Sequence, residues 1–409
     1  MSSFLESGNK EDCSGCGACV QTCGCHAISL VPDKFGFRYP VIDEHKCISC
    51  SLCKNVCPID NPKVSLYDSS KGIAVGGYSK DKDTRALGSS GGFFVGIVRK
   101  LWKPGSVVFG VEEAGVASVK HSFTESLEDV SRFCGSKYLP SDTGRTFKDV
   151  RNFLKAGRMV IYSGTPCQIA GLKSYLGALS DSERLFTIDL VCHGYFAPLY
   201  LKKEMVYYEK RFKSRITRIE WRNKDNGHWR NGCRFIYWFE NGRKKVWMNW
   251  QEKSSPLHRA WLGHLISRPS CPECRFACGE RVGDITLGDY WHVAESSPMY
   301  GGDFGTSIVL GNSPRGCEIL CDMADEYYIE RVDRGAITAY KFAMHGKWKP
   351  HPMMVDATDD LVNLDYRRWI KKWTSPTIRV YMGNVKRLML KGLKALYELI
   401  KQDERKVKL

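Results

Sequence analysis

Midway along the chain, short apolar runs alternate with longer helical patterns. The segments at 159–162 and 185–194 are short and apolar, which predicts two strands. Thr165 is a good helix N-cap and Pro166 suits the first helical position, so a helix is predicted between these strands. A second helix is predicted over 198–213. Strand, helix, strand and helix at this spacing favour a parallel sheet, and open α/β sheets place their sites at the carboxyl ends of such strands.

After residue 213 the pattern changes to two-residue alternation. The segments SRITRIEWR, CRFIYWFE and KKVWMNW alternate apolar and polar residues, and Asn241-Gly242 favours a hairpin turn between the last two. SPLHRAWLGHLI predicts a helix, and DITLGDYW predicts a strand that ends at Asp289, Tyr290 and Trp291. GTSIVLGNSPRGCEIL predicts a last strand and helix. This part of the chain is therefore expected to contain an antiparallel sheet.

The segment GSSGGFFVGIVRKLW, at 88–102, changes from small residues to an apolar helical pattern. Ser89 or Ser90 can cap the predicted helix, and Gly91 and Gly92 lie in its first turn. A helix start without side chains in the way lets a phosphate approach the free N–H groups. An ordinary capped helix is the alternative.

Composition points to redox or metal chemistry inside the cell. The chain has 409 residues, which predicts two or three domains, and 18 cysteines. It shows no apolar signal sequence at its start and no run of about 18 apolar residues. We therefore expect a cytoplasmic protein whose thiols hold metal or carry out redox chemistry rather than form disulfides.

Eight cysteines form two copies of one spacing. DCSGCGACVQTCGC and CISCSLCKNVCP both contain C-x2-C-x2-C-x3-C, the spacing of two-cluster ferredoxins, in which the fourth cysteine of each run serves the other cluster. Structural zinc, the alternative, seldom uses three cysteines per run with such a crossover. Cys25 fits no ligand position, and Gly24 rather than proline follows Cys23. The predicted ligands are Cys13, Cys16, Cys19 and Cys57 for cluster 1, and Cys47, Cys50, Cys53 and Cys23 for cluster 2.

The positive charge is concentrated in one tail. Net charge is +16, and from residue 366 onward 13 Lys or Arg stand against 3 acids, so the charge does not predict a nucleic-acid partner. Apolar positions recur at three and four residues from Val385 to Ile400, which predicts a helix with a basic opposite face. Such a helix can lie on the inner face of an anionic cell membrane, or it can dock on the protein's own core.

Six motifs follow the cysteine runs in order: SSGG, GSKYLPS, GTPCQIAGL, DLVCHG, CPEC and GDITLGDYW. In this order the chain resembles, over 10–345, the family of the coenzyme F420 hydrogenase/dehydrogenase beta subunit, which also includes reductases of the chlorophyll cycle. The resemblance implies an iron–sulfur flavoprotein that binds FAD and passes electrons between clusters, flavin and a substrate.

The resemblance also implies a flavin site. Small residues at a helix start suit a pyrophosphate, and the Lys137 ammonium can stabilise charge on phosphate or reduced flavin. A surface turn is the alternative for the GSKY segment taken alone. Lys137 and His193 are the candidate catalytic residues, with His193 either donating a proton to substrate or packing locally. The cofactor-binding candidates are Ser89, Ser90, Gly91, Gly92, Ser136, Lys137, Tyr138, Ser141, Gly164 and Thr165.

A third 4Fe–4S cluster is a further implication of the resemblance, with Cys278 as a reserve ligand. Two alternatives stay open: a zinc site in the 271–278 segment with a nearby histidine, and Cys167 as a free thiol whose pKa the helix start lowers. Cys134, Cys233, Cys317 and Cys321 show no ligand spacing and are expected to be small buried residues. The candidate ligands of the third cluster are Cys167, Cys192, Cys271 and Cys274.

The expected fold class is α+β or α/β. A two-cluster ferredoxin domain over 1–62 precedes a flavin-binding domain over 63–355, with parts 63–150 and 151–355, and a basic helical tail over 356–409.

The resemblance implies the function of an iron–sulfur flavoprotein oxidoreductase, and it also implies a role in cell-surface polysaccharide biosynthesis. The expected cofactors are two 4Fe–4S clusters, FAD and the third cluster, and the expected partners are an organic substrate and a redox partner. That partner is a ferredoxin, a reduced deazaflavin or a partner subunit. An electron-transfer subunit of a partner enzyme and a non-catalytic polysaccharide-assembly protein are the alternatives. No G-x-G-x-x-G with a following acid stands where an NAD site needs it.

Overall fold

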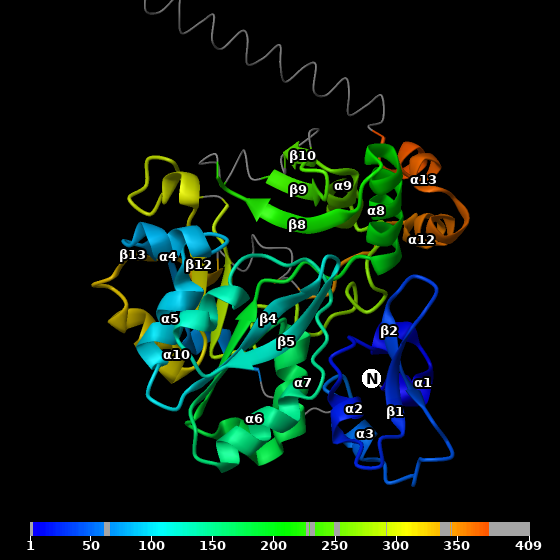
Figure 1. The fold of residues 1–409 in the computed structure, drawn as a ribbon. Helices are drawn as coiled ribbons and strands as arrows, with labels where there is room; N and C mark the ends of the chain where they lie inside the picture. Colours follow the sequence, from blue (N-terminus) through cyan, green and yellow to red (C-terminus); the bar gives the residue numbers. More distant parts are fainter. Residues whose placement is uncertain are drawn as a thin grey trace, which may run out of the picture.

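A large mixed sheet forms the centre of the protein. The structure is a computed structural model that describes residues 3–60, 66–225, 229, 234–248, 254–291, 293–335, 344 and 346–375 (Figure 1). The sheet has the order β13-β3-β12-β11-β7-β6-β4-β5, in which β4, β6, β7 and β11 are parallel and the outer pairs are antiparallel. Its strands are β3 Ile73–Ser79, β4 Val107–Gly115, β5 Ser118–Thr124, β6 Val160–Gly164, β7 Leu185–Leu190, β11 Ile285–Asp289, β12 Ser307–Gly311 and β13 Tyr327–Arg331.

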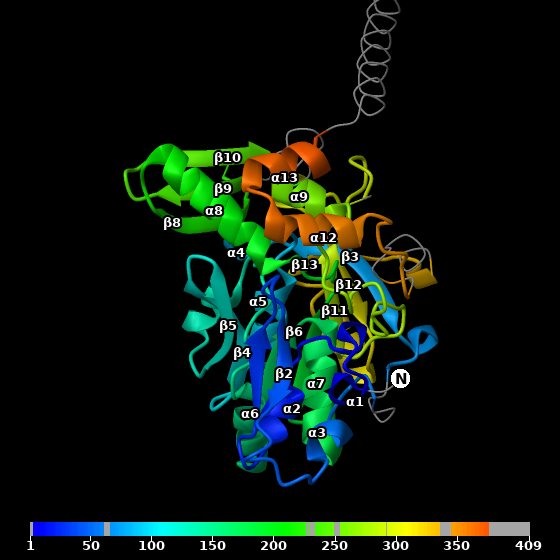
Figure 2. The same cartoon turned by 90° about the vertical axis from the view of Figure 1, so that its right-hand side faces the viewer.

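Helices cover both faces of this sheet because its central strands are apolar on both sides. Successive side chains of a strand point to opposite faces. Val107 and Phe109 of β4 therefore pack with α6 and α7, whereas Val108 packs with α5 and α10. Figures 1 and 2 show these two helical layers with the sheet between them. The helices are α5 Phe93–Leu101, α6 Thr146–Lys155, α7 Pro166–Leu176 and α10 Pro314–Asp322, with the shorter α4 Lys82–Leu87 near β3.

The N-terminal segment lies against α6 and α7, on the side of the sheet opposite α5 (Figure 1). Gln21 joins it to the core, because its amide oxygen accepts a hydrogen bond from the Phe147 backbone N–H at 2.8 Å. The Thr143 hydroxyl donates to the Cys16 carbonyl at 3.1 Å. The segment contains α1 Phe4–Ser7, α2 Ala18–Thr22, the antiparallel pair β1 Ile28–Pro32 and β2 Arg38–Ile42, and α3 Leu52–Asn55.

A second, smaller sheet has its own core. It has the order β10-β9-β8, and aromatic residues of β9 pack against α8, α9 and the helices α12 and α13. Phe37 and Tyr39 of the N-terminal segment belong to the same core. The elements are α8 Pro198–Phe212, β8 Ile216–Asn223, β9 Arg234–Phe239, β10 Lys244–Met248, α9 Pro256–Leu262, α12 Met354–Asn363 and α13 Tyr366–Trp373. Within the described residues, 3-10 helices occur at Lys10–Asp12, Ser69–Lys71, Glu128–Phe133, Gly177–Asp181 and Gly302–Phe304.

Most of the elements predicted from periodicity are confirmed. β6 and β7 are parallel, the segment after residue 213 is antiparallel, and Gly242 has a φ of +78° at the predicted hairpin. The predicted serine cap at 89 or 90 was wrong. Gly92, with a φ of +82°, precedes the helix and offers no side-chain cap. The predicted basic tail helix, from Val385 onward, lies outside the described residues.

Glu204 ties the C-terminal helices to the small sheet. Its carboxyl group is fully buried on α8, where it accepts hydrogen bonds from the hydroxyls of Tyr237 at 2.7 Å and Tyr366 at 2.6 Å. Burial raises the pKa of Glu204 to about 7, because the apolar surroundings disfavour the charged carboxylate. The hydrogen bonds from the two tyrosines lower this pKa, but their effect is smaller than that of burial. The folded protein therefore holds a proton at Glu204 that the unfolded chain releases near pH 4.5.

A pH dependence of stability follows from this residue. Because the folded pKa is raised, the stability contributed by protonated Glu204 is fully present below about pH 4.5 and is lost as the pH rises to about 7. Each pKa unit is worth about 1.4 kcal/mol, so the loss approaches about 3 kcal/mol. Differential scanning calorimetry between about pH 5 and pH 8 should show a smaller fall in Tm for Glu204→Gln than for the wild type. Glu209→Gln, on the same helix at a carboxylate that is not fully buried, is the control. Equal slopes for all three proteins would contradict the prediction.

Candidate functional site

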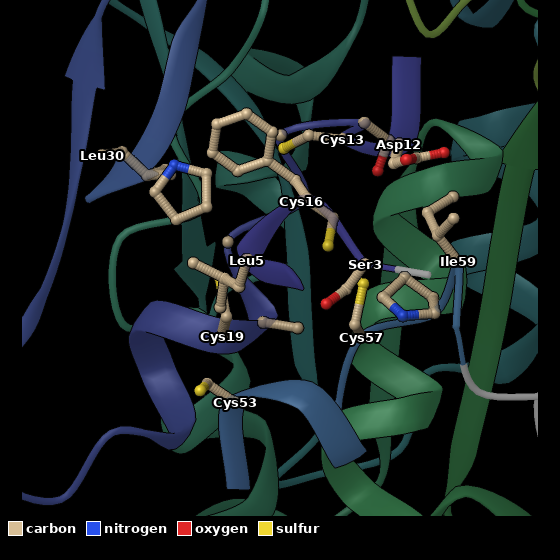
Figure 3. A pocket seen from close by; sticks show the side chains of 17 residues that line it. Ser3, Leu5, Asp12, Cys13, Cys16, Cys19, Leu30, Cys53, Cys57 and Ile59 are labelled. Atoms are coloured by element: carbon tan, nitrogen blue, oxygen red, sulfur yellow. The ribbon is translucent and has the colours of Figure 1, made fainter. Parts of the chain in front are cut away.

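The four ligands predicted for cluster 1 surround one cavity. Cys13, Cys16, Cys19 and Cys57 line it, and so does Cys53, a predicted ligand of cluster 2 (Figure 3). The cavity measures about 30 Å³, and about 10–15 Å³ already admits one water, so the space accepts a larger group. Cys57 comes from the second cysteine run and the other three come from the first run. The structure thus brings together the crossed set predicted for cluster 1.

The second predicted ligand set is brought together in part. Burial raises the pKa of Cys53, and the nearby thiols of Cys50 and Cys23 raise it further, which places Cys23 of the first run beside the second run. Cys47 and Cys50 are exposed. Cys25, predicted to be a bystander, has its sulfur 3.6 Å from that of Cys23. The Cys23 sulfur also accepts from the Ala27 N–H at 3.3 Å.

A second cavity is lined by four cysteines from three separate segments. Cys167 lies in the first turn of α7, Cys192 follows β7, and Cys271 and Cys274 follow α9. β6 and β7 are adjacent and parallel, so the loops that follow them meet at one edge of the sheet. The cavity measures about 40 Å³. The structure therefore brings together the four residues proposed as ligands of a third cluster.

Hydrogen-bond donors point at the sulfur atoms of this second cavity. The Gly194 N–H donates to Cys192 Sγ at 3.3 Å, and the Tyr195 N–H donates to Cys271 Sγ at 3.4 Å. The Thr165 hydroxyl lies 3.3 Å from Cys167 Sγ. Donors of this kind stabilise negative charge on sulfur and tune iron–sulfur centres.

Burial makes the free thiolates of this cavity costly. It raises the pKa of Cys192, Cys271 and Cys274 to about 12 each, because a bare thiolate loses its hydration there. A bound cation reverses this balance, since thiolates are the form that ligates metal. The donor set therefore fits a group that brings positive charge, as an iron–sulfur cluster does. The alternative of a free low-pKa thiol at Cys167 gains no support, because burial outweighs the helix start and raises the pKa of this thiol.

The zinc alternative at 271–278 gains no support. Cys278, the reserve ligand, is not among the residues that line the cavity, and its thiol donates to the Glu280 carbonyl at 2.9 Å. Within the described part of the chain, no three His, Cys, Asp or Glu side chains converge closely enough to hold a single metal ion.

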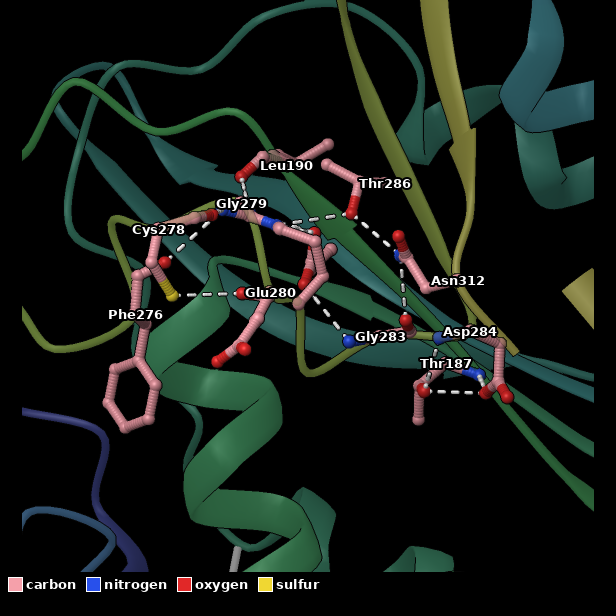
Figure 4. Close-up of polar contacts among 12 residues, drawn as sticks. Thr187, Leu190, Phe276, Cys278, Gly279, Glu280, Gly283, Asp284, Thr286 and Asn312 are labelled. Carbon is pink, nitrogen blue, oxygen red and sulfur yellow. Dashed lines mark hydrogen bonds and ion pairs between the residues drawn. The ribbon is translucent and has the colours of Figure 1, made fainter. Parts of the chain in front are cut away.

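A buried ion pair holds the two loops that carry the second thiol set. Arg281 donates to the Asp189 carboxylate at 2.9 Å, and both side chains are almost fully buried. Arg281 also donates to the carbonyls of Leu190, Phe276 and Cys278, which join the end of β7 to the 271–283 loop (Figure 4). This network positions Cys192 relative to the Cys271–Cys274 pair. It was missed from sequence, because nothing local marks which arginine reaches which strand.

The flavin candidates fall into two groups. In the first, the hydroxyls of Ser89 and Ser136 lie 2.7 Å apart, and the Lys137 ammonium donates to the Cys134 carbonyl at 2.7 Å. Burial lowers the pKa of Lys137, although the thiol of Cys134 acts in the opposite direction. The Ser90 hydroxyl lies 2.7 Å from that of Ser307, and the Gly91 N–H donates to the same Ser307 oxygen at 2.9 Å. The structure thus joins the SSGG and GSKY motifs.

The second group surrounds the start of α7. The Gln168 amide donates to the Ser141 hydroxyl at 2.9 Å, and its oxygen accepts from the Thr165 N–H at 3.0 Å in a capping box. His121, which was not predicted, lies 2.9 Å from Ser141, and burial lowers its pKa to about 4. Ser141 is therefore held in an internal network. The T-x-x-Q spacing of Thr165 and Gln168 is a sequence signal for this capping box.

Tyr138 and His193, the remaining candidates, pack among aromatic rings. The centroid of the Tyr138 ring lies 4.8 Å from that of Trp261, and the His193 ring lies 6.4 Å from the same indole. Both residues thus border the second core, and His193 follows Cys192 directly in the chain. Their proposed roles in cofactor binding and catalysis stay predictions.

The described helices are also informative about membranes. Within the ranges that the structure describes, none of them is both long enough and apolar enough to cross a bilayer.

The buried ion pair generates a stability prediction. Asp189→Asn leaves the Arg281 guanidinium buried without its carboxylate, which should cost about 3–5 kcal/mol of the free energy of unfolding. Thermal melting of the purified holoprotein measures the loss as a lower Tm. Asp284→Asn is a matched control. The hydrogen-bond donors of this buried carboxylate, Thr187 and Tyr67, are neutral, so this variant should lose less of the free energy of unfolding. A Tm for Asp189→Asn equal to or above that of the control would rule out the ion pair as the stabilising element.

Two parts of the chain match known protein families. Residues 157–334 match the family described as the C terminus of the coenzyme F420 hydrogenase/dehydrogenase beta subunit, and residues 12–61 match the 4Fe–4S dicluster domain. A trichloroethene reductive dehalogenase of Dehalococcoides mccartyi is 33% identical over 63 residues, which are 13% of this chain. The chain spans about a tenth (11%) of the length of that relative.

A solved structure is also similar. A chain of the F420-reducing [NiFe] hydrogenase complex from Methanosarcina barkeri matches 76% of this chain and 94% of its own length, at 16% identity and a TM-score of 0.43. The family resemblance of the ordered motifs is confirmed by the two matched domains. This chain joins a 4Fe–4S dicluster domain to a C-terminal domain of the coenzyme F420 hydrogenase/dehydrogenase beta-subunit family.

Proposed function

We propose that this chain is an iron–sulfur flavoprotein oxidoreductase that carries electrons from its N-terminal domain to FAD and an organic substrate. One observation carries the proposal. The two thiol-lined cavities share a wall, because Ser14 lines both of them. Cysteines therefore extend from the surface of the N-terminal domain to the carboxyl edge of the central sheet.

The solvent exposure of the cysteines indicates where electrons enter the proposed relay. Cys47 and Cys50 are exposed, so cluster 2 is the contact point for an external redox partner. Cluster 1 lies behind it, with Cys57 supplied by the second run. Cys16 lies near enough to Cys167 for charges on their two sulfur atoms to interact. The third cluster is therefore the next electron carrier after cluster 1. The proposed domains are 1–62 for the relay, 63–355 for flavin and substrate, and 356–409 for the tail.

The residues of the first flavin group fit the phosphates of FAD. Gly92 leaves the first N–H groups of the nine-residue α5 without a side-chain cap, and the GSKY motif brings the partly buried ammonium of Lys137. Free N–H groups and a cation are the partners that a pyrophosphate requires. FAD, when bound, converts one-electron delivery into two-electron chemistry. The protein's task is to bind it, exclude water and hold charge beside it with Lys137.

A second candidate function is an electron-transfer subunit that serves a partner enzyme. Ile48 and Leu52 favour it, because they are 73% and 51% exposed beside the exposed cysteines and offer an apolar contact for another protein. The matched family is also described as a beta subunit. Turnover of substrate by the isolated chain would support the oxidoreductase, whereas turnover only with a second protein would support the electron-transfer role.

Some finer roles rest only on the family resemblance or on the residue pattern of the tail. The role in cell-surface polysaccharide biosynthesis, the non-catalytic assembly alternative and the peripheral contact with the membrane stay predictions. The segment predicted to make the membrane contact lies outside the described residues.

The content of cofactors tests the proposed function. Anaerobic purification should yield about 12 iron atoms with matching acid-labile sulfide, as three 4Fe–4S clusters require, and one FAD per chain. The double variant Cys13→Ala with Cys50→Ala should lose most of the iron of clusters 1 and 2 and keep its FAD.

Two other results would count against the proposal. About eight iron atoms without flavin in the wild-type protein would reduce it to an electron-transfer or assembly protein. Loss of FAD from the double variant would show that the N-terminal clusters and the flavin site do not load independently.

Lys137 is expected to bind FAD through its charge. Lys137→Ala removes a charged hydrogen-bond donor, which is worth about 1.5–3 kcal/mol, so the Kd for FAD should rise at least about tenfold. Fluorescence titration of flavin-free protein measures the affinity, and the iron content should stay at the wild-type value. Lys120→Ala, at a half-exposed lysine paired with Glu112, is the control. An unchanged Kd would remove Lys137 from the flavin site.

A further inference from the structure

A buried arginine lies between the two thiol-lined cavities. Arg268 is only 3% exposed, and it lies three residues before Cys271 of the second cavity. Its Nε donates to the Cys13 carbonyl at 2.9 Å, and its Nη2 lies 3.6 Å from Cys13 Sγ in the first cavity. Its side chain therefore reaches from one cysteine set to the other.

The contacts of Arg268 leave its positive charge without a carboxylate. Besides Cys13, its guanidinium donates to the Arg38 carbonyl at 3.0 Å and lies 4.4 Å from the centre of the Tyr39 ring. Among the residues that the structure describes, none of its hydrogen-bond partners is an acid. The other buried arginines of the sheet edge differ, because Arg281 pairs with Asp189 and Arg222 pairs with Asp289.

Burying a cation without an anion costs free energy of folding, so a buried arginine requires negative charge nearby. The cysteine sulfur atoms of both cavities are where that negative charge lies. The Arg268 carbonyl accepts a hydrogen bond from the Cys271 N–H at 2.9 Å, and Cys271 lines the second cavity, so the arginine lies beside that cavity as well as beside Cys13. Four thiolates around a 4Fe–4S core carry net negative charge, and one added electron increases it.

The loop that covers Arg268 keeps the charge close to both cavities. Gly15 has a φ of +75°, and a Cβ at this position would stand 3.3 Å from the Arg268 guanidinium carbon. Ser14, the preceding residue, lines both cavities. The guanidinium is thus sealed from solvent at their shared wall, where a low dielectric strengthens its electrostatic effect.

We propose that Arg268 is the shared counter-ion of cluster 1 and the third cluster, and that it raises the reduction potential of both. The inference rests on the proposed function, since it requires clusters in both cavities. Each cluster gains one electron from a one-electron donor, with no bond broken and no proton taken up. Arg268 acts through its positive charge and contacts no substrate. It stabilises the reduced form of both neighbouring clusters, so their reduction potentials stay close. An electron can therefore pass between them without a large loss of free energy.

The test measures reduction potentials in the holoprotein. Redox titration monitored by electron paramagnetic resonance should show two of three potentials lowered in Arg268→Gln, and the potential of cluster 2 unchanged. The expected shift is at least tenfold in the equilibrium constant for reduction, which is about 59 mV for one electron. Arg268→Lys keeps the charge, so its potentials should stay near those of the wild type. Arg38→Gln, at a half-exposed arginine paired with Asp142, is the control and should move none of them.

Arg268→Met serves as a second neutral variant if Arg268→Gln does not load iron, because its length and apolar contact with Tyr39 preserve packing. Wild-type potentials in a fully loaded neutral variant would overturn the proposal, as would equal shifts in the lysine and neutral variants. A wild-type protein with about eight iron atoms would instead refute the third cluster of the proposed function, and the shared role with it. About 12 iron atoms with unmoved potentials would overturn the role of Arg268 alone.

Discussion

The close approach of the Cys16 loop to helix α7 is the constraint on which the proposed relay depends. A Cβ on Gly171 would stand 2.8 Å from Cys16 Sγ, so only glycine lets the cysteine rest against this helix. The same helix carries Cys167 in its first turn, about one helical turn from Gly171. One rigid element therefore contacts both thiol sets, and the distance between the proposed clusters is fixed by helix geometry rather than by a flexible linker.

Two buried arginines near this helix play different electrostatic roles. Arg281 is neutralised by Asp189, so its pair stabilises the loops around Cys192 without adding net charge to the cavity. Arg268 has carbonyl, sulfur and aromatic partners, which leave its charge available to the thiols. The sheet edge thus combines a neutral pair that stabilises the site with a cation positioned to tune it, and both effects are strong because water is excluded.

The sequence predicted those parts of the site in which ligands lie close together in the chain. The spacing of Cys13, Cys16 and Cys19 brings three thiols to one cavity through a single loop and a short helix, and the repeated run implies the crossover of Cys57. The order of motifs identified the second set of cysteines. The hydroxyl contacts of Ser141 and the exchange of a serine cap for Gly92 depended on neighbours from other segments, so local propensity could not predict them.

By itself, then, the sequence determined the sets of cysteines proposed as ligands, the parallel strands that bring Cys167 and Cys192 to one edge, and the family of the C-terminal domain. These properties depend on spacing, on periodicity and on the order of motifs, all of which can be read along the chain. Only the tertiary structure decided that the two cavities share Ser14, that Asp189 neutralises Arg281, and that no hydrogen-bond partner of Arg268 in the described part of the chain is a carboxylate. The physical reason is that the energy of a buried charge depends on every group packed around it, and the groups around Arg268 come from segments 255 and 230 residues away.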